Sequence, residues 1–193
     1  MLIICYLHTV YDHSQMSIVF ITGNKHKASE VQLVLNDREV IMHDIDLPEI
    51  QGSSEEIIRH KAEHAKQFIK GPFIVEDSGL EYDALNGMPG PYVKWFLTSI
   101  GNDGLVRLLA GYDNKRANAV CNVAYYDGTT VHIFKGLLKG TIVAAKGTSA
   151  FGWDNIFKPD GFNETYGEMK PELKNSLSHR YLALAQLKQA LNN

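Results

Sequence analysis

The residues best suited to chemistry follow one short apolar segment. Residues 73–75 (FIV) run directly into Glu76, Asp77, Ser78 and Gly79. Such a run, bounded by turn residues, is typical of a strand buried on both faces of an α/β sheet. Ligands bind these sheets beyond the carboxyl ends of the strands, where carboxylates can hold a magnesium ion that arrives with a phosphate ligand. The solvated start of a turn would need the same residues, and the local pattern does not separate the two interpretations.

A second candidate site follows the first predicted strand, residues 17–22. Gly23 and Asn24 come next, and residues 25–36 place apolar side chains at helical spacing. This strand, turn and helix would present backbone N–H groups and a positive helix end to a phosphate, with Lys27 adding a charge and Asn24 a donor. A turn with solvated lysines is the commoner explanation, and neither a P-loop nor a dinucleotide fingerprint is present.

Other polar residues have two interpretations each. Glu49 adds a carboxylate in a turn-rich connector, and Lys61 borders the apolar stripe of a predicted helix, where it reaches either a polyphosphate or the solvent. His60 and His64 have the i, i+4 spacing of a zinc helix, but the HExxH motif is absent and a solvated face is the better interpretation.

Aromatic and basic residues near the C-terminus form a further group. Phe151 and Trp153 flank a glycine, where aromatic rings stack on a flat base or belong to the core. His179 and Arg180 fall in the first turn of a helix capped by Ser178, which is the end where the helix dipole disfavours cations. Residues that break a local rule are candidates for function.

These residues must be positioned by alternating strands and helices. Ser53 and Glu56 form a capping box for a helix expected to end at Lys70, and the C-terminal helix carries an apolar edge at Leu184 and Leu187. We expect an α/β fold with a central mixed sheet flanked by helices. Its other predicted elements are strands at 38–43, 117–126, 129–134 and 136–145 and helices at 92–100 and 103–110.

Composition narrows the class of protein. The chain has 193 residues, a net charge of −3, 21% charged and 45% hydrophobic residues, which is ordinary for one soluble domain. We expect no nucleic-acid partner, because there is no basic excess, and no membrane partner, because no apolar run approaches ~20 residues. Two cysteines without metal-site spacing fit a reducing compartment, so we expect a cytoplasmic protein.

The N-terminus is expected to stand apart from this domain. Residues 1–16 lack the pattern of a signal peptide, and we interpret them as a flexible leader or an extension from an upstream start codon, with an extra edge strand as the alternative. Residues 17–193 would then form the single domain.

Together these motifs resemble the inosine triphosphate pyrophosphatase, or Ham1-like, family of nucleoside triphosphate pyrophosphatases. No single block is decisive, but their order along the chain is the family's order. The shared blocks are Thr22-Gly23-Asn24 with Lys27 and Glu30, Leu47-Pro48-Glu49 with Gln51-Gly52, Glu76-Asp77-Ser78-Gly79-Leu80, Gly87-Met88-Pro89-Gly90, Phe151-Gly152-Trp153-Asp154, Thr165 with Glu168-Met169, and Lys174-Asn175 with Ser178-His179-Arg180.

The resemblance implies an activity and an architecture. It implies hydrolysis of purine nucleoside triphosphates with a deaminated base (ITP, dITP, XTP) to the monophosphate and pyrophosphate. It also implies dependence on Mg²⁺, with Mn²⁺ as a substitute, a homodimer, and two lobes with a cleft between them.

The resemblance also assigns roles to residues. Asp77 would be the general base and, with Glu49, a metal ligand, while Lys27 and Lys61 would neutralise the phosphates and count as catalytic. The substrate-binding set would be Thr22, Gly23, Asn24, Lys25, His26, Lys27, Lys61, Ser78, Lys94, Phe151, Gly152, Trp153, Asp154, Lys174, His179 and Arg180.

The base end would select by hydrogen bonding. Hypoxanthine and xanthine carry a 6-keto acceptor where adenine carries an amino donor, so donors on Lys174, His179 and Arg180 would favour the keto bases. A buried donor left unpaired costs roughly 1–3 kcal/mol. Two positions depart from the family pattern: Asn155 replaces a proline and would loosen the base-side loop, and Gly167 replaces an alanine and would cost helix stability.

Two other functions fit part of the pattern. A related pyrophosphatase could act on modified pyrimidines or methylated nucleotides, and a nucleotide-binding regulator could retain the cleft without turnover. The regulator would have no use for Asp77 and Glu49 together, which favours an enzyme.

Overall fold

The structure, a computed structural model, describes residues 17–149 and 151–192, so the predicted leader lies outside the described residues. A seven-stranded mixed sheet has the order β2-β1-β3-β5-β6-β7, with β4 paired to β3. The strands are β1 (Ile18–Ile21), β2 (Val40–His43), β3 (Phe73–Tyr82), β4 (Pro89–Gly90), β5 (Arg116–Tyr126), β6 (Val131–Ile142) and β7 (Phe157–Pro159). The helices are α1 (Lys25–Val34), α2 (Ser54–Ala65), α3 (Val93–Arg107), α4 (Pro171–Leu177) and α5 (His179–Leu191), with single 3₁₀ turns at Asp83–Leu85 and Asp154–Ile156.

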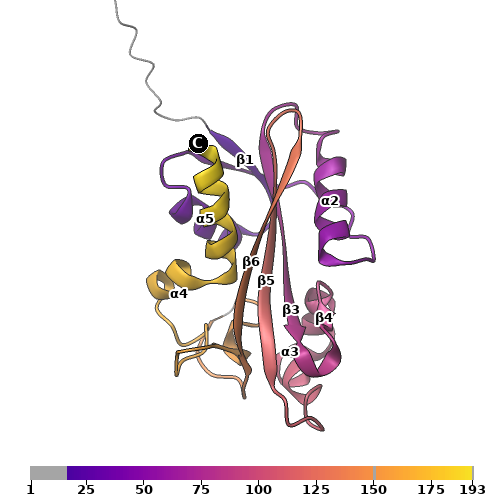
Figure 1. Cartoon of the computed structure of the whole chain (residues 1–193), viewed down its shortest axis with the longest axis vertical. Coiled ribbons are helices and arrows are strands. Elements are labelled where there is room, and N and C mark those ends of the chain that lie inside the picture. Colours follow the sequence, from indigo (N-terminus) through magenta and orange to yellow (C-terminus); the bar gives the residue numbers. More distant parts are fainter. Residues whose placement is uncertain (1–16, 150, 193) are drawn as a thin grey trace, which may run out of the picture.

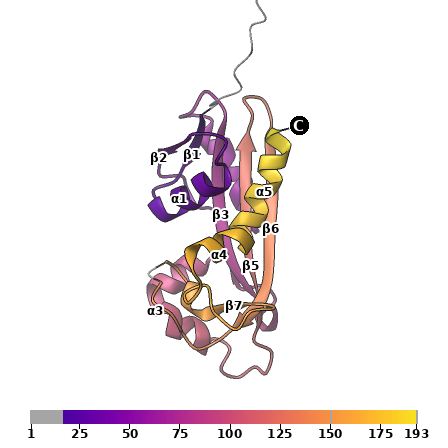
Figure 2. The same ribbon diagram turned by 90° about the vertical axis from the view of Figure 1, so that its left-hand side faces the viewer.

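Helices cover both faces of the sheet, which confirms the expected fold class. Figure 1 shows α2 and α5 on opposite sides of the long strands β3, β5 and β6, and Figure 2 shows α1 beside α5. Alternate side chains of β3 enter two different cores: Ile74 packs in the core that includes α1 and α5 residues, whereas Phe73 and Val75 pack in the core of α2. A third core lies at the other end of the strands, beneath α3 and β7. None of the described helices is both long and apolar enough to cross a membrane.

Strand β3 extends past the end of its parallel neighbour. It pairs with β1 only at Val19↔Phe73 and Phe20↔Ile74, but it pairs with β5 from Phe73 to Tyr82. The prediction that Glu76 and Asp77 follow the strand was therefore wrong, because the antiparallel partner carries β3 through both residues. They still lie beyond the end of β1, at an edge of β3 that β1 leaves uncovered.

Helix caps follow the sequence pattern closely. Asn24 caps α1, Ser53 and Glu56 form the expected capping box on α2, and Ser178 caps α5 by accepting from the Tyr181 N–H at 3.2 Å. The α2 helix stops at Ala65, short of the expected residue 70, because the chain tightens there into i→i−3 hydrogen bonds. The two helices expected at 92–100 and 103–110 occur as α3, which a non-helical residue divides at position 101.

The region after β5 differs from the sequence expectation. Two strands were predicted at 129–134 and 136–145, but β6 is one strand that passes through Gly136. A Cβ on Gly136 would lie 1.9 Å from the His179 carbonyl oxygen and 2.6 Å from the Ala183 nitrogen. This glycine therefore permits a close approach of α5 to the sheet and does not end a strand. Helix α4 and the short strands β4 and β7 were not predicted.

Gly136→Ala should lower the free energy of unfolding by about 1–3 kcal/mol, because the added methyl group forces α5 away from β6. Urea denaturation measures the change. Gly111→Ala is the matched control, since its Cβ would meet no atom within 4 Å. Equal stability of the two variants would contradict the close approach of α5 to the sheet.

Candidate active site

A cleft of about 750 Å³ lies where β1 ends. Its walls come from the β1–α1 turn, the 44–49 connector, α2, β3, α3, the 151–154 loop and the start of α5. Every residue predicted to bind substrate or metal lines this cleft except Lys25, Asp77 and Lys174. Lys25 is exposed, and Asp77 lines a smaller adjoining pocket of about 330 Å³ together with Glu49. Lys174 is buried, with its ammonium over the ring of the cleft residue Phe151.

Side chains within the β1–α1 turn hold its backbone in place. The Thr22 hydroxyl accepts from the Asn24 N–H at 3.0 Å, and Asn24 Oδ1 accepts from the N–H groups of His26 and Lys27 at 3.0 and 3.2 Å. The Asn24 oxygen thus caps α1, which leaves its NH₂ group as the donor that it can offer to a ligand. The turn places Lys27 at the cleft in a fixed position.

The two predicted metal ligands converge on one ammonium group. Lys61 Nζ donates to Asp77 Oδ1 at 2.6 Å and to Glu49 Oε1 at 3.1 Å, and Lys94 Nζ donates to Glu49 Oε2 at 3.3 Å. Burial alone would raise the pKa of Glu49, but the two lysines hold it below its ordinary value. Burial opposes the charge of Lys61, yet Asp77 and Glu49 raise its pKa, so Lys61 and Glu49 form an ion pair at neutral pH.

These carboxylates fit a magnesium ion. No cluster of three or more His, Cys, Asp and Glu side chains suited to a metal occurs within the described ranges 17–149 and 151–192. However, Mg²⁺ commonly takes only one or two carboxylates, with substrate phosphates and waters completing its coordination. Glu49 and Asp77 already share one cation, and the buried Asp77 Oδ2 has no hydrogen-bond partner among the described residues.

Glu76 is the centre of a second ionic cluster, in which its own side chain and that of Arg180 are buried. It accepts from Arg180 Nε at 2.6 Å, Arg180 Nη2 at 3.0 Å and Ser78 Oγ at 2.7 Å, and Lys27 Nζ lies 3.0 Å away. Burial would raise the pKa of Glu76, but Arg180 and Lys27 hold it well below the ordinary value. Glu76, assigned at most a supporting role from the sequence, therefore joins α1, β3 and α5.

Glu30 extends this cluster and was missing from the predicted site. It accepts from Lys174 Nζ at 3.2 Å and pairs with Arg180, while Lys174 also donates to Asp154 Oδ2 at 2.6 Å. Burial raises the pKa of Asp154 despite the nearby Lys174. The sequence signal for Glu30 was its position one helical turn after Lys27, on the same face of α1.

The two aromatic residues of the 151–154 loop, Phe151 and Trp153, differ in how far they are exposed to the cleft. The half-buried Phe151 ring lies 4.6 Å from Lys174 Nζ and 5.6 Å from the His26 ring. Trp153 borders the cleft but is only 7% exposed, and it packs against Phe157 and His179. Phe151 is thus the more accessible stacking surface.

His179 is a buried histidine without hydrogen bonds. It is 2% exposed, and neither ring nitrogen has a partner among the described residues. Burial, together with the neighbouring Arg180 charge, lowers its pKa well below the ordinary value. The ring is therefore neutral at physiological pH and offers one donor and one acceptor.

His179 should make stability depend on pH. Because the pKa of His179 is lowered on folding, the unfolded chain binds a proton at this residue more readily than the folded chain does. The contribution of His179 to the free energy of unfolding is therefore fully present above pH ~6.5 and is lost as the pH falls below that value. The expected loss approaches about 1.4 kcal/mol per pH unit. Denaturation between pH 7.5 and 5 should show a shallower slope for His179→Gln than for the exposed control His43→Gln. Equal slopes would contradict a buried neutral histidine.

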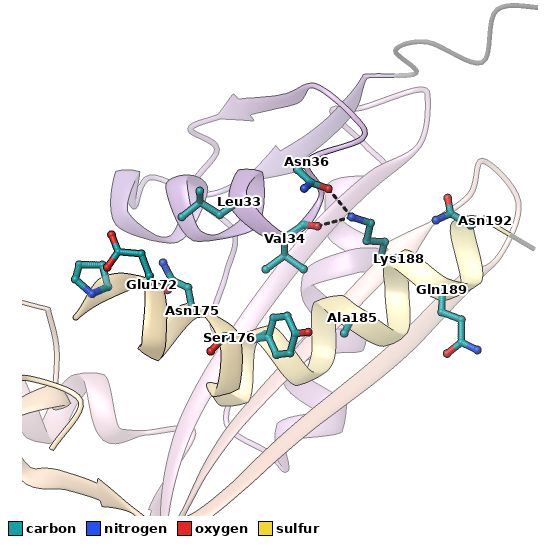
Figure 3. Close-up of a pocket in the computed structure, with 12 residues that line it drawn as sticks. Leu33, Val34, Asn36, Glu172, Asn175, Ser176, Ala185, Lys188, Gln189 and Asn192 are labelled. Atoms are coloured by element: carbon teal, nitrogen blue, oxygen red, sulfur yellow. Dashed lines mark hydrogen bonds between the residues drawn. The ribbon is translucent and has the colours of Figure 1, made fainter. Parts of the chain in front are cut away.

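A second hollow, of about 680 Å³, lies between α1, α4 and α5 (Figure 3). None of the predicted site residues lines it. Lys188 Nζ donates there to the Val34 carbonyl oxygen at 3.0 Å and to Asn36 Oδ1 at 2.5 Å, which holds α5 against α1.

Comparisons with known proteins agree with this geometry. A model described as the Ham1 family matches residues 18–190. The inosine triphosphate pyrophosphatase of Schizosaccharomyces pombe is 49% identical over 180 residues, which covers 92% of this chain and 96% of the relative. The solved Ham1 protein of Staphylococcus aureus superimposes with a TM-score of 0.79 at 29% identity, covering 91% of this chain and 98% of its own. A nucleoside-triphosphatase and dITP/XTP pyrophosphatase from Mycobacterium abscessus gives 0.70 at 29% identity, covering 89% and 98%.

Proposed function

The chain belongs to the Ham1 family, and from that membership we propose that it hydrolyses ITP, dITP and XTP to the nucleoside monophosphate and pyrophosphate. One observation carries the proposal. In and beside a single cleft, Lys61 lies between two carboxylates at one end, and an ion-paired cluster that includes Lys174 and adjoins Phe151 lies at the other end. The triphosphate of a nucleotide needs charged groups like those around Lys61, and its purine ring needs a stacking surface with hydrogen-bond donors like that around Phe151.

At the phosphate end, the protein positions charge and a water molecule. Lys27, Lys61 and Lys94 bind the phosphate oxygens, since each ammonium already faces the cleft. Asp77 accepts the proton of the attacking water, a role that its unpaired Oδ2 leaves open. Glu49 and Asp77 would hold a magnesium ion, or Mn²⁺ in its place, and the bound ion would supply neutralising charge to the triphosphate.

At the base end, the remaining hydrogen-bond donors select the purine. Lys174 has three N–H groups, of which two donate to Glu30 and Asp154, so one remains for the ligand. His179 contributes one ring N–H, while Arg180 is held by Glu76 and Glu30. A 6-keto oxygen accepts from these donors, whereas the adenine amino group would leave them unpaired at a cost of roughly 1–3 kcal/mol each.

The proposal extends to assembly and location. Residues 17–193 form one domain with two lobes, and the protein is a cytoplasmic homodimer. Exposed apolar side chains near the start of α3 support an interface between copies, since Trp95 is 58% and Met88 47% exposed.

Asp77→Asn should reduce turnover of ITP by at least about 10²-fold while most of the nucleotide affinity remains, because the amide cannot accept the proton from water. Pyrophosphate release measures turnover, calorimetry measures binding, and the exposed Asp113→Asn is the control.

A panel of ITP, XTP, GTP, ATP and modified pyrimidine triphosphates, assayed on the wild-type protein with and without Mg²⁺, tests the proposed activity itself. Faster hydrolysis of ATP or modified pyrimidines would refute the proposed substrate, and binding without any turnover would indicate a regulator.

Lys174→Ala should narrow the ratio of kcat/KM for ITP over ATP by about tenfold, because one donor to the keto oxygen is lost. The exposed Lys170→Ala provides a matched control on the same segment. If both nucleotides lost activity in equal proportion, selection by Lys174 would be ruled out.

A further inference from the structure

The two positions that depart from the family pattern contact each other. A Cβ on Gly167 would lie 2.0 Å from Asn155 Oδ1, far inside any allowed contact. Its next neighbours, the Lys146 carbonyl oxygen and Asn155 Cα, would be at 2.9 and 3.0 Å. The backbone of Gly167 is not in the left-handed region, so its conformation does not itself require glycine. The Asn155 side chain is thus the severest obstacle to alanine here, and the Lys146 carbonyl oxygen is a milder one.

The expectation that Asn155 loosens the loop at the base end of the cleft was wrong, because its side chain and backbone both form hydrogen bonds that hold this loop. Its Nδ2 donates to the Ser149 carbonyl oxygen at 2.9 Å, and its backbone oxygen accepts from the Lys146 N–H at 2.8 Å. The side-chain oxygen is buried against Gly167 without a partner among the described residues. The Asn155 amide thus leaves its oxygen unpaired, while its NH₂ group holds the Ser149 carbonyl in place.

Ser149 in turn fixes two residues of the proposed base pocket. Its hydroxyl accepts from the Phe151 N–H at 3.1 Å and donates to Asp154 Oδ2 at 3.2 Å. The same Asp154 oxygen accepts from Lys174 at 2.6 Å. A chain of contacts thus connects Gly167 through Asn155 and Ser149 to the stacking ring and to the proposed keto donor.

We propose that Asn155 is a positioning residue for the purine end of the cleft and that Gly167 is the residue that permits it, so that the two act as one unit. This inference rests on the proposed function for its effect on nucleotides, but not for the contacts themselves. An alanine at position 167 pushes the Asn155 side chain aside, because rotating that amide relieves the closest clash. The bond to Ser149 is then lost, just as it is when Asn155 itself is truncated.

The test is a double-mutant cycle with Gly167→Ala, Asn155→Ala and both together. Each single variant should lower kcat/KM for ITP about five- to tenfold, mainly through KM, as expected for the loss of one positioning hydrogen bond. The double variant should be no worse than the more impaired single variant. Asn155→Asp, which keeps the shape but removes the donor, should behave like Asn155→Ala, and Gly111→Ala should change nothing. The inference would be overturned if the two losses of kcat/KM multiplied in the double variant, or if KM for ITP were unchanged in the single variants.

Hydrogen exchange separates this inference from the proposed function. The amides of Lys146 and Phe151 should exchange about tenfold faster in each single variant than in the wild type. In the double variant they should exchange no faster than in the single variants. If these changes occur but ITP is not hydrolysed by the wild type, the proposed function fails and the coupling stands. If ITP is hydrolysed but exchange is unchanged in both single variants, the coupling fails and the function stands.

Discussion

A carboxylate buried in the middle of a sheet has to be neutralised, and Glu76 imposes this requirement on the whole protein. Its side chain and that of Arg180 are each 2% exposed, and Lys27 provides the second cation. Desolvation of such a pair cancels much of its attraction, so the cluster is weak evidence for added stability. Its effect is geometric: α1 and α5 cannot shift relative to β3 without leaving a buried charge unpaired.

The period of two along a strand explains how one cleft can hold two ionic clusters. Glu76 points with Ile74 toward α1 and α5, whereas Asp77 points with Val75 toward α2. Were β1 longer, it would cover the edge between these faces. Because β1 ends at Ile21, residues from both faces of the sheet reach the same space.

Local signals in the sequence predicted the parts of the fold that depend on local physics. The caps at Ser53 and Ser178 were readable because a side-chain oxygen satisfies N–H groups only two or three residues away. Asn24 caps α1 in the same way, although the sequence was interpreted as offering it only as a donor to a ligand. The length of β3 was not readable, because its last pair, Tyr82↔Ala117, is made with the distant strand β5. The contact of Glu30 with Lys174, 144 residues away, is equally invisible to spacing rules. The family resemblance placed Asp154 and Lys174 in one site but left Glu30 out of it.

Charge balance links the two ends of the cleft to the chemistry of the ligand. The cluster of Glu30, Glu76 and Asp154 with Lys27, Lys174 and Arg180 carries no net formal charge. Its Lys174 and Arg180 side, at the proposed base end, suits an uncharged purine, while Lys27 lies toward the proposed phosphate end. At the phosphate end, Glu49 and Asp77 face Lys61 and Lys94, again without excess charge. A strongly anionic triphosphate is therefore poorly compensated by the protein alone. Under the proposed function, a divalent cation entering with the triphosphate would correct the balance and give the two carboxylates a second partner. Such a site would favour the metal-bound nucleotide over the free one, since only the metal-bound form would leave both the lysines and the carboxylates paired.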